Sequence, residues 1–185
     1  DDKGVILAQL YQYFIPATPA KPKTAEQWIA KAVPKKDIRY FLQYLYSDGS
    51  NLVGTDGHRM HYVENMDYDA GSYNIVMDKI DPMHAGKYPN WERVVPNTSK
   101  STPYGFNTLT LKTIELKGIK NAKNKWNYEI YNYRGDLLLT VNKSYLDDAL
   151  SFMDNPTVYY TSKIDSILIS DGRVKAVVMP VRATK

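Results

Sequence analysis

The chain has 185 residues, of which 43% are hydrophobic and 24% charged, and its formal net charge is +4 at pH 7. This length and balance predict a folded protein of about one to one and a half average domains and exclude a repeat array or a disordered chain. The absence of cysteine excludes disulfides and thiolate metal sites, and no apolar run reaches the roughly 20 residues that cross a bilayer, so we expect a cytoplasmic protein.

The N-terminal part contains an apolar segment, a proline-rich stretch and a short helix. Residues 5–15 are mostly apolar, and the prolines that follow, from Pro16 to Pro22, favour extended backbone. Thr24 is a suitable N-cap and Pro34 ends the apolar pattern. These signals predict a helix over residues 25–33.

A β-meander is predicted after this helix. Aromatic and aliphatic residues over 38–46 are followed by turn residues and by short apolar runs over 52–54 and 59–63. We expect a further strand over 74–80 and an irregular connector over 81–96.

The second half repeats this order of elements in outline. Gly49 and Gly135 both occupy predicted turns after aromatic stretches, so a weak internal duplication is plausible. The predicted elements are a strand over 109–111, a basic helix over 112–122, strands over 126–133 and 137–141, a helix capped by Ser144, and strands over 158–161, 166–170 and 175–181.

Basic residues concentrate in two segments, 21–39 and 112–125, and acidic residues in 64–81. Because both basic segments overlap predicted helices, they predict one positive surface that faces a polyanion such as nucleic acid. A solvated lysine-rich face without a partner is the alternative, and charge alone leaves it open.

The sequence lacks the usual signatures of catalysis. It contains no phosphate-binding glycine motif, and His58 and His61 are spaced so that they point to opposite faces of a strand and cannot share a metal. Asp147 and Asp148 are expected in the first turn of a helix, where carboxylates favour the helix dipole. We therefore predict a binding protein that is not an enzyme and has no metal or cofactor.

Three segments together resemble a known family, the bacterial DNA polymerase III beta subunit, or sliding clamp. Thr55-Asp56-Gly57-His58-Arg59-Met60 resembles the family's TDGHRL signature, and Gly86 to Pro96 resembles its GRFPDYxRVLP linker. Val177 to Arg182 resembles its C-terminal VVMPMRL. Since the segments occur in the family's order, the resemblance implies an α+β fold of two clamp-like lobes, with antiparallel sheets and helices on one face. The first lobe, residues 1–98, is shortened, and the second is residues 99–185.

In the family these segments converge on a pocket that receives short QLxLF-like peptides from polymerases, clamp loaders and repair proteins. Such an apolar cleft with Arg and His at its rim suits leucine and aromatic anchors, and a peptide is expected to bind with roughly micromolar strength, about −8 kcal/mol. The alternative for residues 177–181 is a plain core strand. By position, the resemblance implies a peptide site made of Leu42, Thr55, Gly57, His58, Arg59, Met60, Pro89, Arg93, Val94, Ser166, Val177, Val178, Met179, Pro180, Val181 and Arg182.

The resemblance also implies that the basic helices touch duplex DNA without sequence preference inside an oligomeric ring. Since the family ring has six lobes, two lobes per chain imply a trimer. So small a clamp also suggests a phage source. A non-ring adaptor or decoy for clamp-binding peptides remains the alternative function. The implied DNA contacts are Lys31, Lys35, Lys36, Arg39, Tyr40, Phe41, Lys112, Lys117, Lys120 and Lys123.

Overall fold

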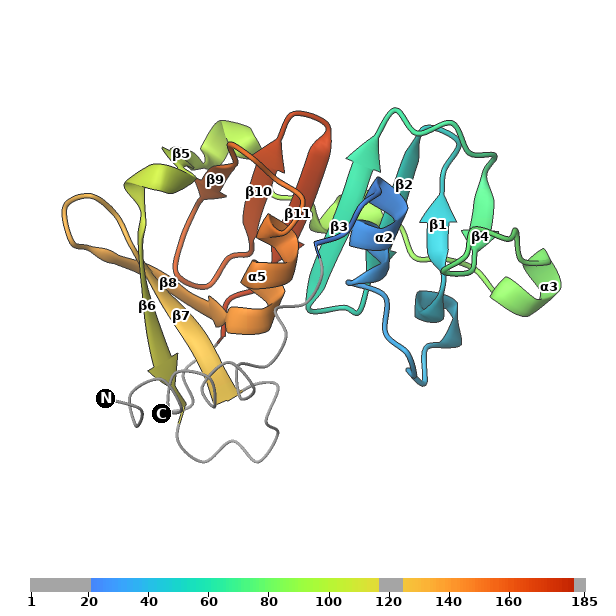
Figure 1. Ribbon diagram of the computed structural model, residues 1–185, viewed down its shortest axis with the longest axis horizontal. Coiled ribbons are helices and arrows are strands. Elements are labelled where there is room, and N and C mark those ends of the chain that lie inside the picture. The colour runs from blue at the N-terminus through green and yellow to red at the C-terminus, as the bar shows by residue number, and fades with distance from the viewer. Residues whose placement is uncertain (1–20, 117–124, 182–185) are drawn as a thin grey trace, which may run out of the picture.

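The computed structural model describes residues 21–116 and 125–181, and antiparallel strands dominate it (Figure 1). One eight-stranded sheet has the order β4-β1-β2-β3-β11-β10-β9-β5, and a second sheet has the order β6-β7-β8. Strands from the first and last thirds of the chain therefore share one sheet. This architecture confirms the predicted α+β class with antiparallel sheets, whereas the division into two lobes at residue 98 stays a prediction.

The strands of the large sheet are β1 (Leu45–Ser47), β2 (Asn51–Thr55), β3 (Arg59–Glu64), β4 (Gly71–Tyr73), β5 (Thr102–Gly105), β9 (Thr157–Tyr160), β10 (Ile167–Asp171) and β11 (Val174–Val178). The small sheet contains β6 (Thr110–Glu115), β7 (Trp126–Tyr131) and β8 (Leu137–Asn142). The helices are α2 (Ala25–Ala30), α3 (Pro82–Ala85) and α5 (Lys143–Leu150), and single 3-10 turns occur at Tyr40–Gln43, Trp91–Val94, Thr98–Lys100 and Phe106–Thr108. None of the helices described is long and apolar enough to span a bilayer.

The large sheet has two buried faces, because its central strands alternate between them. In β3, His61 and Val63 face one core cluster while Met60 and Tyr62 face the other. The first cluster lies under α2, α5 and the small sheet. The second lies under the connector that follows α3. We call these the helix face and the connector face.

Helix α2 begins where the sequence predicts and ends earlier. The Thr24 hydroxyl accepts a hydrogen bond from the Gln27 amide, which confirms the cap. After Ala30 the backbone amides bond to carbonyls three residues back, up to Val33. The tighter final turn follows from Pro34, which disfavours helical backbone at the residue before it.

The predicted strand over 74–80 is wrong. The Asn74 side-chain oxygen accepts hydrogen bonds from the amides of Val76 and Asp78, and Met77 has a φ of 68°. This local turn replaces ladder hydrogen bonds with side-chain ones. The strand in this region, β4, lies just before it.

Two predictions for the second half also need correction. Residues 112–115 of the predicted basic helix lie in β6, where Lys112 stands opposite Glu129, because β6 pairs with β7 along its whole length. Residues 117–124 lie outside the described structure. The N-cap of α5 is Asn142 rather than Ser144, so Asp147 and Asp148 lie beyond the first turn of that helix.

The other turn predictions and most of the other strands are confirmed, but the segment 38–46 forms a strand only from Leu45, after a 3-10 turn at Tyr40–Gln43, and the last strand ends at Val178. The meander β1–β2–β3 forms with Gly49 in its first turn, and Gly135 lies in the β7–β8 turn, both at positive φ. The aromatic stretches before these glycines differ, however, because Tyr40 lies in a 3-10 turn and Tyr128 in a strand, so the proposed internal repeat is matched only at the two hairpins that contain the glycines.

Candidate functional site

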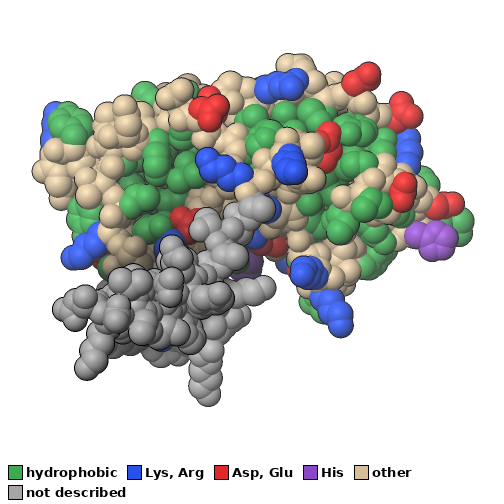
Figure 2. All heavy atoms as spheres, viewed as in Figure 1, with side chains coloured by type: hydrophobic (Ala, Val, Ile, Leu, Met, Phe, Trp, Pro, Cys, Tyr) green, Lys and Arg blue, Asp and Glu red, His purple; other side chains and the backbone are tan. Residues whose placement is uncertain are grey.

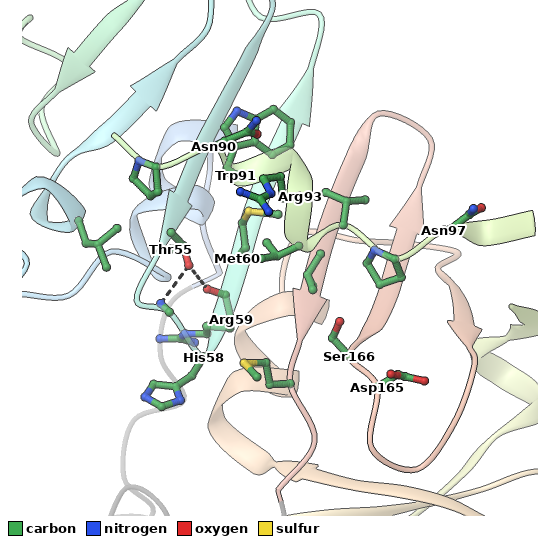
Figure 3. A pocket seen from close by; sticks show the side chains of 18 of the residues that line it. Thr55, His58, Arg59, Met60, Asn90, Trp91, Arg93, Asn97, Asp165 and Ser166 are labelled. Atoms are coloured by element: carbon green, nitrogen blue, oxygen red, sulfur yellow. Dashed lines mark hydrogen bonds between the residues drawn. The ribbon is translucent and has the colours of Figure 1, made fainter. Parts of the chain in front are cut away.

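A cavity of about 700 Å³ lies on the connector face, where three separate parts of the chain meet (Figure 3). Its walls come from β3 and the turn before it, from the end of β11, and from the connector over residues 89–97. We call this cavity the pocket. Its buried apolar base is formed by Leu42, Met60, Trp91 and Val177.

The β2–β3 turn is held in shape by its own side chains. The Thr55 hydroxyl donates to the Arg59 carbonyl at 2.6 Å and accepts from the Gly57 amide at 3.0 Å (Figure 3). The Asp56 carboxylate accepts from the His58 and Arg59 amides. Gly57 has a φ of +87°, a conformation that other residues adopt only with strain. The turn therefore presents His58 at the pocket rim.

The end of β11 runs beside this turn. Val177 stands opposite Met60 in the β3–β11 ladder, and the Met179 amide donates to the His58 carbonyl at 3.1 Å. Two of the three segments that carry the family resemblance are thus neighbours in one sheet. Met179, at 46% exposure, leaves an apolar side chain uncovered at the pocket.

The connector completes the pocket because aromatic side chains fasten it to the sheet. Tyr88 stacks on Tyr46 with ring centroids 4.7 Å apart, and Trp91 packs against Tyr62 at 5.0 Å. Burial raises the pKa of the Tyr88 hydroxyl. Since such aromatic pairs stabilise beyond their buried area, the connector is a fixed wall of the pocket.

The pocket rim is basic, but its cationic side chains differ in whether they already pair with other groups of the protein. The Arg39 guanidinium hydrogen-bonds to Asp37 at 2.8 Å, which lowers the pKa of Asp37 to about 2. Within the described ranges, the side chains of Arg93 and Lys100 form no hydrogen bond or ion pair. Asp165, on the opposite side, accepts from the Ser162 hydroxyl.

Arg59 lines the pocket, yet its charged end lies in an ion network on the helix face. Its guanidinium donates to Asp148 of α5 at 2.6 Å and to the Lys31 carbonyl at 2.6 Å, and it lies 4.5 Å from the Tyr145 ring centroid. Lys31 also reaches Asp148, at 3.1 Å. This network ties α2 and the β2–β3 turn to α5, so Arg59 joins the early and late parts of the chain.

His61 lies fully buried next to this network, stacked on Trp28 at 4.3 Å. Its Nδ1 lies 2.9 Å from the Trp28 carbonyl, which only accepts hydrogen bonds, so the proton is on Nδ1. Desolvation by burial lowers the pKa of His61 to about 3. His58, by contrast, is exposed. The two histidines are therefore separated, as their spacing predicts. Among the described residues, no group of three or more His, Cys, Asp or Glu side chains could hold a metal ion.

Most of the residues expected in the peptide site line the pocket, namely Leu42, Thr55, Gly57, His58, Arg59, Met60, Pro89, Arg93, Val94, Ser166, Val177 and Met179. Three of the expected residues do not. Val178 points to the helix face, while Pro180 and Val181 leave the pocket and pair with Val141 and Thr140 of β8. Arg182 lies outside the described residues.

Other lining residues were not predicted. Four of them belong to the connector segment that carries the resemblance, namely Asn90, Trp91, Val95 and Pro96. The same segment could therefore have indicated that they line the pocket. Arg39 and Phe41 line the pocket although the sequence placed them near DNA. The pocket is also lined by loop residues that no sequence signal indicated, namely Asn97, Lys100, Thr161 and Asp165.

The cations expected to touch DNA are dispersed. Lys31 is paired with Asp148, Lys112 is in β6, and Lys117, Lys120 and Lys123 lie outside the described residues. Lys35, Lys36 and Tyr40 are exposed after α2. In the view of Figure 2, basic and acidic side chains are interspersed over α2 and α5 rather than gathered into one basic band.

The fold is similar to that of solved bacterial sliding clamps. The Helicobacter pylori beta clamp bound to a DNA ligase peptide is 14% identical, with a TM-score of 0.57 over 92% of this chain and 69% of that one. The Pseudomonas aeruginosa clamp bound to griselimycin is 18% identical, with a TM-score of 0.54 over 91% of this chain and 68% of that one. Caulobacter crescentus pol III beta is 16% identical, with a TM-score of 0.57 over 84% of this chain and 62% of that one.

These similarities are structural. No protein-family model matches the sequence, and no curated protein does. The chain spans between about 62% and 69% of the length of these three clamps. The expected clamp-like fold is confirmed, while the shortened first lobe and the phage source stay predictions.

Proposed function

We propose that this chain is a clamp-like processivity factor that holds partner proteins by a short peptide in the pocket and contacts duplex DNA without sequence preference. The observation that supports it most is the apolar pocket at the junction of β3, β11 and the connector, lined by twelve of the sixteen residues expected there. The clamp-like fold adds to this support, and one of the similar clamps is bound to a DNA ligase peptide.

The pocket has the properties that an extended peptide requires. Met60, Trp91 and Val177 offer a buried apolar base for leucine or aromatic anchors. Arg93 and Lys100 at the rim supply charges that are not already paired within the described residues. The function needs no catalytic residue, and its partners are the peptide tails of a replicative polymerase and of a clamp loader.

A labelled QLxLF-type peptide titrated against the chain tests the pocket by fluorescence anisotropy. We expect saturable binding with a Kd on the order of 1 µM, or about −8 kcal/mol. Met179→Ala weakens it at least tenfold, because Met179 is exposed at the pocket, while Met83→Ala, at an exposed methionine of α3, changes nothing. Equal affinity in these two variants removes the pocket from the proposal.

The ring and the DNA contact need their own experiment. Strands β4 and β5 lie at opposite ends of the large sheet, so head-to-tail contact between these two ends of neighbouring chains is the arrangement that joins chains into a closed assembly. A solution mass near three chains, with retention on circular but not on linear duplex, supports the ring.

A second function, a non-ring adaptor that only captures peptides, is favoured by one observation. Lys31, at the C-cap of α2, and Lys143, the first residue of α5, are both ion-paired to aspartates rather than free for phosphates. If the chain is a monomer that binds the peptide, and if its affinity for duplex DNA is negligible even at low salt, the adaptor function is supported over the clamp.

A further inference from the structure

We propose that the pocket selects partner peptides that carry acidic residues beside their apolar anchors. The residues that select them are Arg93 in the connector and Lys100 in the 3-10 turn that follows it. This inference rests on the proposed peptide-binding function of the pocket and adds to it the class of peptide that binds best. The apolar base and the two cations then recognise different parts of the same ligand.

The first argument is the balance of charge around the pocket. Its charged lining residues are Arg39, Arg59, Arg93, Lys100 and one carboxylate, Asp165. Arg39 is already paired with Asp37, and Arg59 is paired with Asp56 and Asp148. The side chains of the two other cations form no hydrogen bond or ion pair within the described residues. Unpaired positive charge therefore exceeds negative charge at the rim, and an anionic group on the ligand complements it.

The second argument is that Arg93 lies next to the apolar base. It belongs to the same 3-10 turn as Trp91, which forms part of that base and packs against Tyr62. Figure 3 shows Arg93 close to Trp91 and Met60. A peptide whose leucine or aromatic anchors rest on the base therefore brings its neighbouring residues to the guanidinium. A DNA phosphate has no apolar group for the base, so the combination favours a peptide.

The third argument is that Lys100 extends from a turn that is held in place on both sides. Before it, the Asn97 side chain accepts hydrogen bonds from the amide and the hydroxyl of Ser99. After it, the Ser101 hydroxyl lies 2.9 Å from the hydroxyl of Thr161, which also lines the pocket. The Lys100 side chain itself is exposed, so its ammonium can reach a ligand from a fixed backbone. Such preorganisation lowers the entropy lost on binding.

The expected preference is modest, because both cations are exposed. Acidic side chains of the protein also lie nearby in sequence or at the rim. Glu92 precedes Arg93 but does not line the pocket, and Asp165 is exposed and accepts a hydrogen bond from the Ser162 hydroxyl. Ion pairs between exposed groups contribute little each, so two of them tighten peptide binding by about threefold to tenfold.

The test uses the full chain and three labelled peptides that share a QLxLF-type core. The core is flanked on both sides by two serines, two glutamates or two lysines, and fluorescence anisotropy measures binding. At about 0.1 M salt we expect the glutamate-flanked peptide to bind about threefold to tenfold more tightly than the serine-flanked one, and the lysine-flanked peptide to bind more weakly. At about 1 M salt the Debye length falls from about 10 Å to about 3 Å, so the three affinities converge.

Double variants locate the preference in the pocket. Arg93→Gln/Lys100→Gln removes it, so that the glutamate-flanked and serine-flanked peptides bind within about twofold of each other. Lys87→Gln/Lys163→Gln is the matched control and keeps the preference, because it removes the same charge from two exposed positions that do not line the pocket. Arg93→Lys/Lys100→Arg retains both charges and also keeps the preference. Thermal unfolding of each variant checks that the fold is unchanged.

Each outcome decides the proposal. A glutamate preference that is lost only in Arg93→Gln/Lys100→Gln supports it. Equal affinities of the unmodified chain for the three peptides overturn it, and binding of the serine-flanked peptide then leaves the proposed function intact. A preference that Lys87→Gln/Lys163→Gln also loses overturns it too, because the net charge of the chain then attracts the peptide.

Three further results would also count against it. A preference that persists in Arg93→Gln/Lys100→Gln assigns the selection to other cations. Weaker binding of duplex DNA by that variant, without any preference among the peptides, assigns the two side chains to DNA. If none of the three peptides binds, the proposed function and this inference fail together.

Discussion

Replacing Asp148 with alanine removes the carboxylate that joins α5 to α2 and to the β2–β3 turn. Asp148 accepts from Arg59 at 2.6 Å and from Lys31 at 3.1 Å. Burial alone raises the pKa of Asp148, yet the hydrogen bonds from Arg59 and Lys31 hold it below its usual value overall. The aspartate is therefore charged at neutral pH and contributes to stability as an anion.

The cost follows from the burial of the partners. Hydrogen bonds to charged groups contribute about 1.5 to 3 kcal/mol each when buried. The Asp148 side chain is 29% exposed, and Arg59 keeps its contacts with Asp56 and the Lys31 carbonyl. We expect Asp148→Ala to lower the free energy of unfolding by about 2 kcal/mol, after discounting for solvent exposure. For a chain of this size that lowers Tm by about 4 to 8 °C.

Asp147→Ala is the matched control, one residue away in the same helix. Asp147 pairs with Lys143 through side chains that are 46% and 35% exposed, and it also accepts an exposed hydrogen bond from the Tyr128 hydroxyl. Because these contacts are exposed, its loss costs about 1 kcal/mol or less. Thermal unfolding followed by circular dichroism measures both variants. Equal shifts in Tm would show that the Arg59–Asp148 contact does not hold the early and late parts of the chain together.

Three other predictions concern the core, a close packing contact and salt. Because burial lowers the pKa of His61 to about 3 from the 6.5 of the unfolded chain, the unfolded state binds the extra proton between those values. The free energy of unfolding therefore falls with decreasing pH below about 6.5, by up to about 1.4 kcal/mol per pH unit. Urea titrations at pH 7, 6 and 5 measure this dependence. If His61→Phe has the same dependence of unfolding free energy on pH, the prediction is refuted. Gly54→Ala places a Cβ 2.8 Å from Val33 and 2.9 Å from Ile29, so it lowers stability by about 1 to 3 kcal/mol, whereas Gly135→Ala, with open space around it, costs only backbone strain of about 1 to 2 kcal/mol. Urea midpoints measure both variants, and a loss below about 1 kcal/mol in Gly54→Ala contradicts the close packing of α2 on β2. If Lys35 and Lys36 touch phosphates, Lys35→Gln/Lys36→Gln flattens the salt dependence of duplex binding by a slope of about 2, and an unchanged slope in anisotropy titrations places the contact elsewhere.

The sequence predicted those parts of the fold that depend on local signals. Thr24, Gly49 and Gly135 mark a cap and two turns, and alternation of apolar residues marks β3, β10 and β11. The failures come from competing local interactions. Asn74 bonds to nearby amides and turns the chain where apolar residues predicted a strand, and pairing with β7 draws Lys112 into β6 rather than a helix.

The pocket was predicted in outline for a different reason. Its three segments were located by resemblance, and the Met60–Val177 register brings two of them together. The position of the Arg59 guanidinium was not predictable, because its partner Asp148 is 89 residues away and no periodicity links them. Residues after Met179 were also misplaced, since bonding to β8 turns the chain away from the pocket.

The most direct test of the central claim is calorimetric titration of a QLxLF-type peptide into the full chain. The account predicts one site per chain with a Kd of about 1 µM, at least tenfold weaker when Met179→Ala is added and unchanged when Met83→Ala is added. An absence of heat at any peptide concentration up to 1 mM, or the same affinity with and without the Met179 side chain, would contradict it.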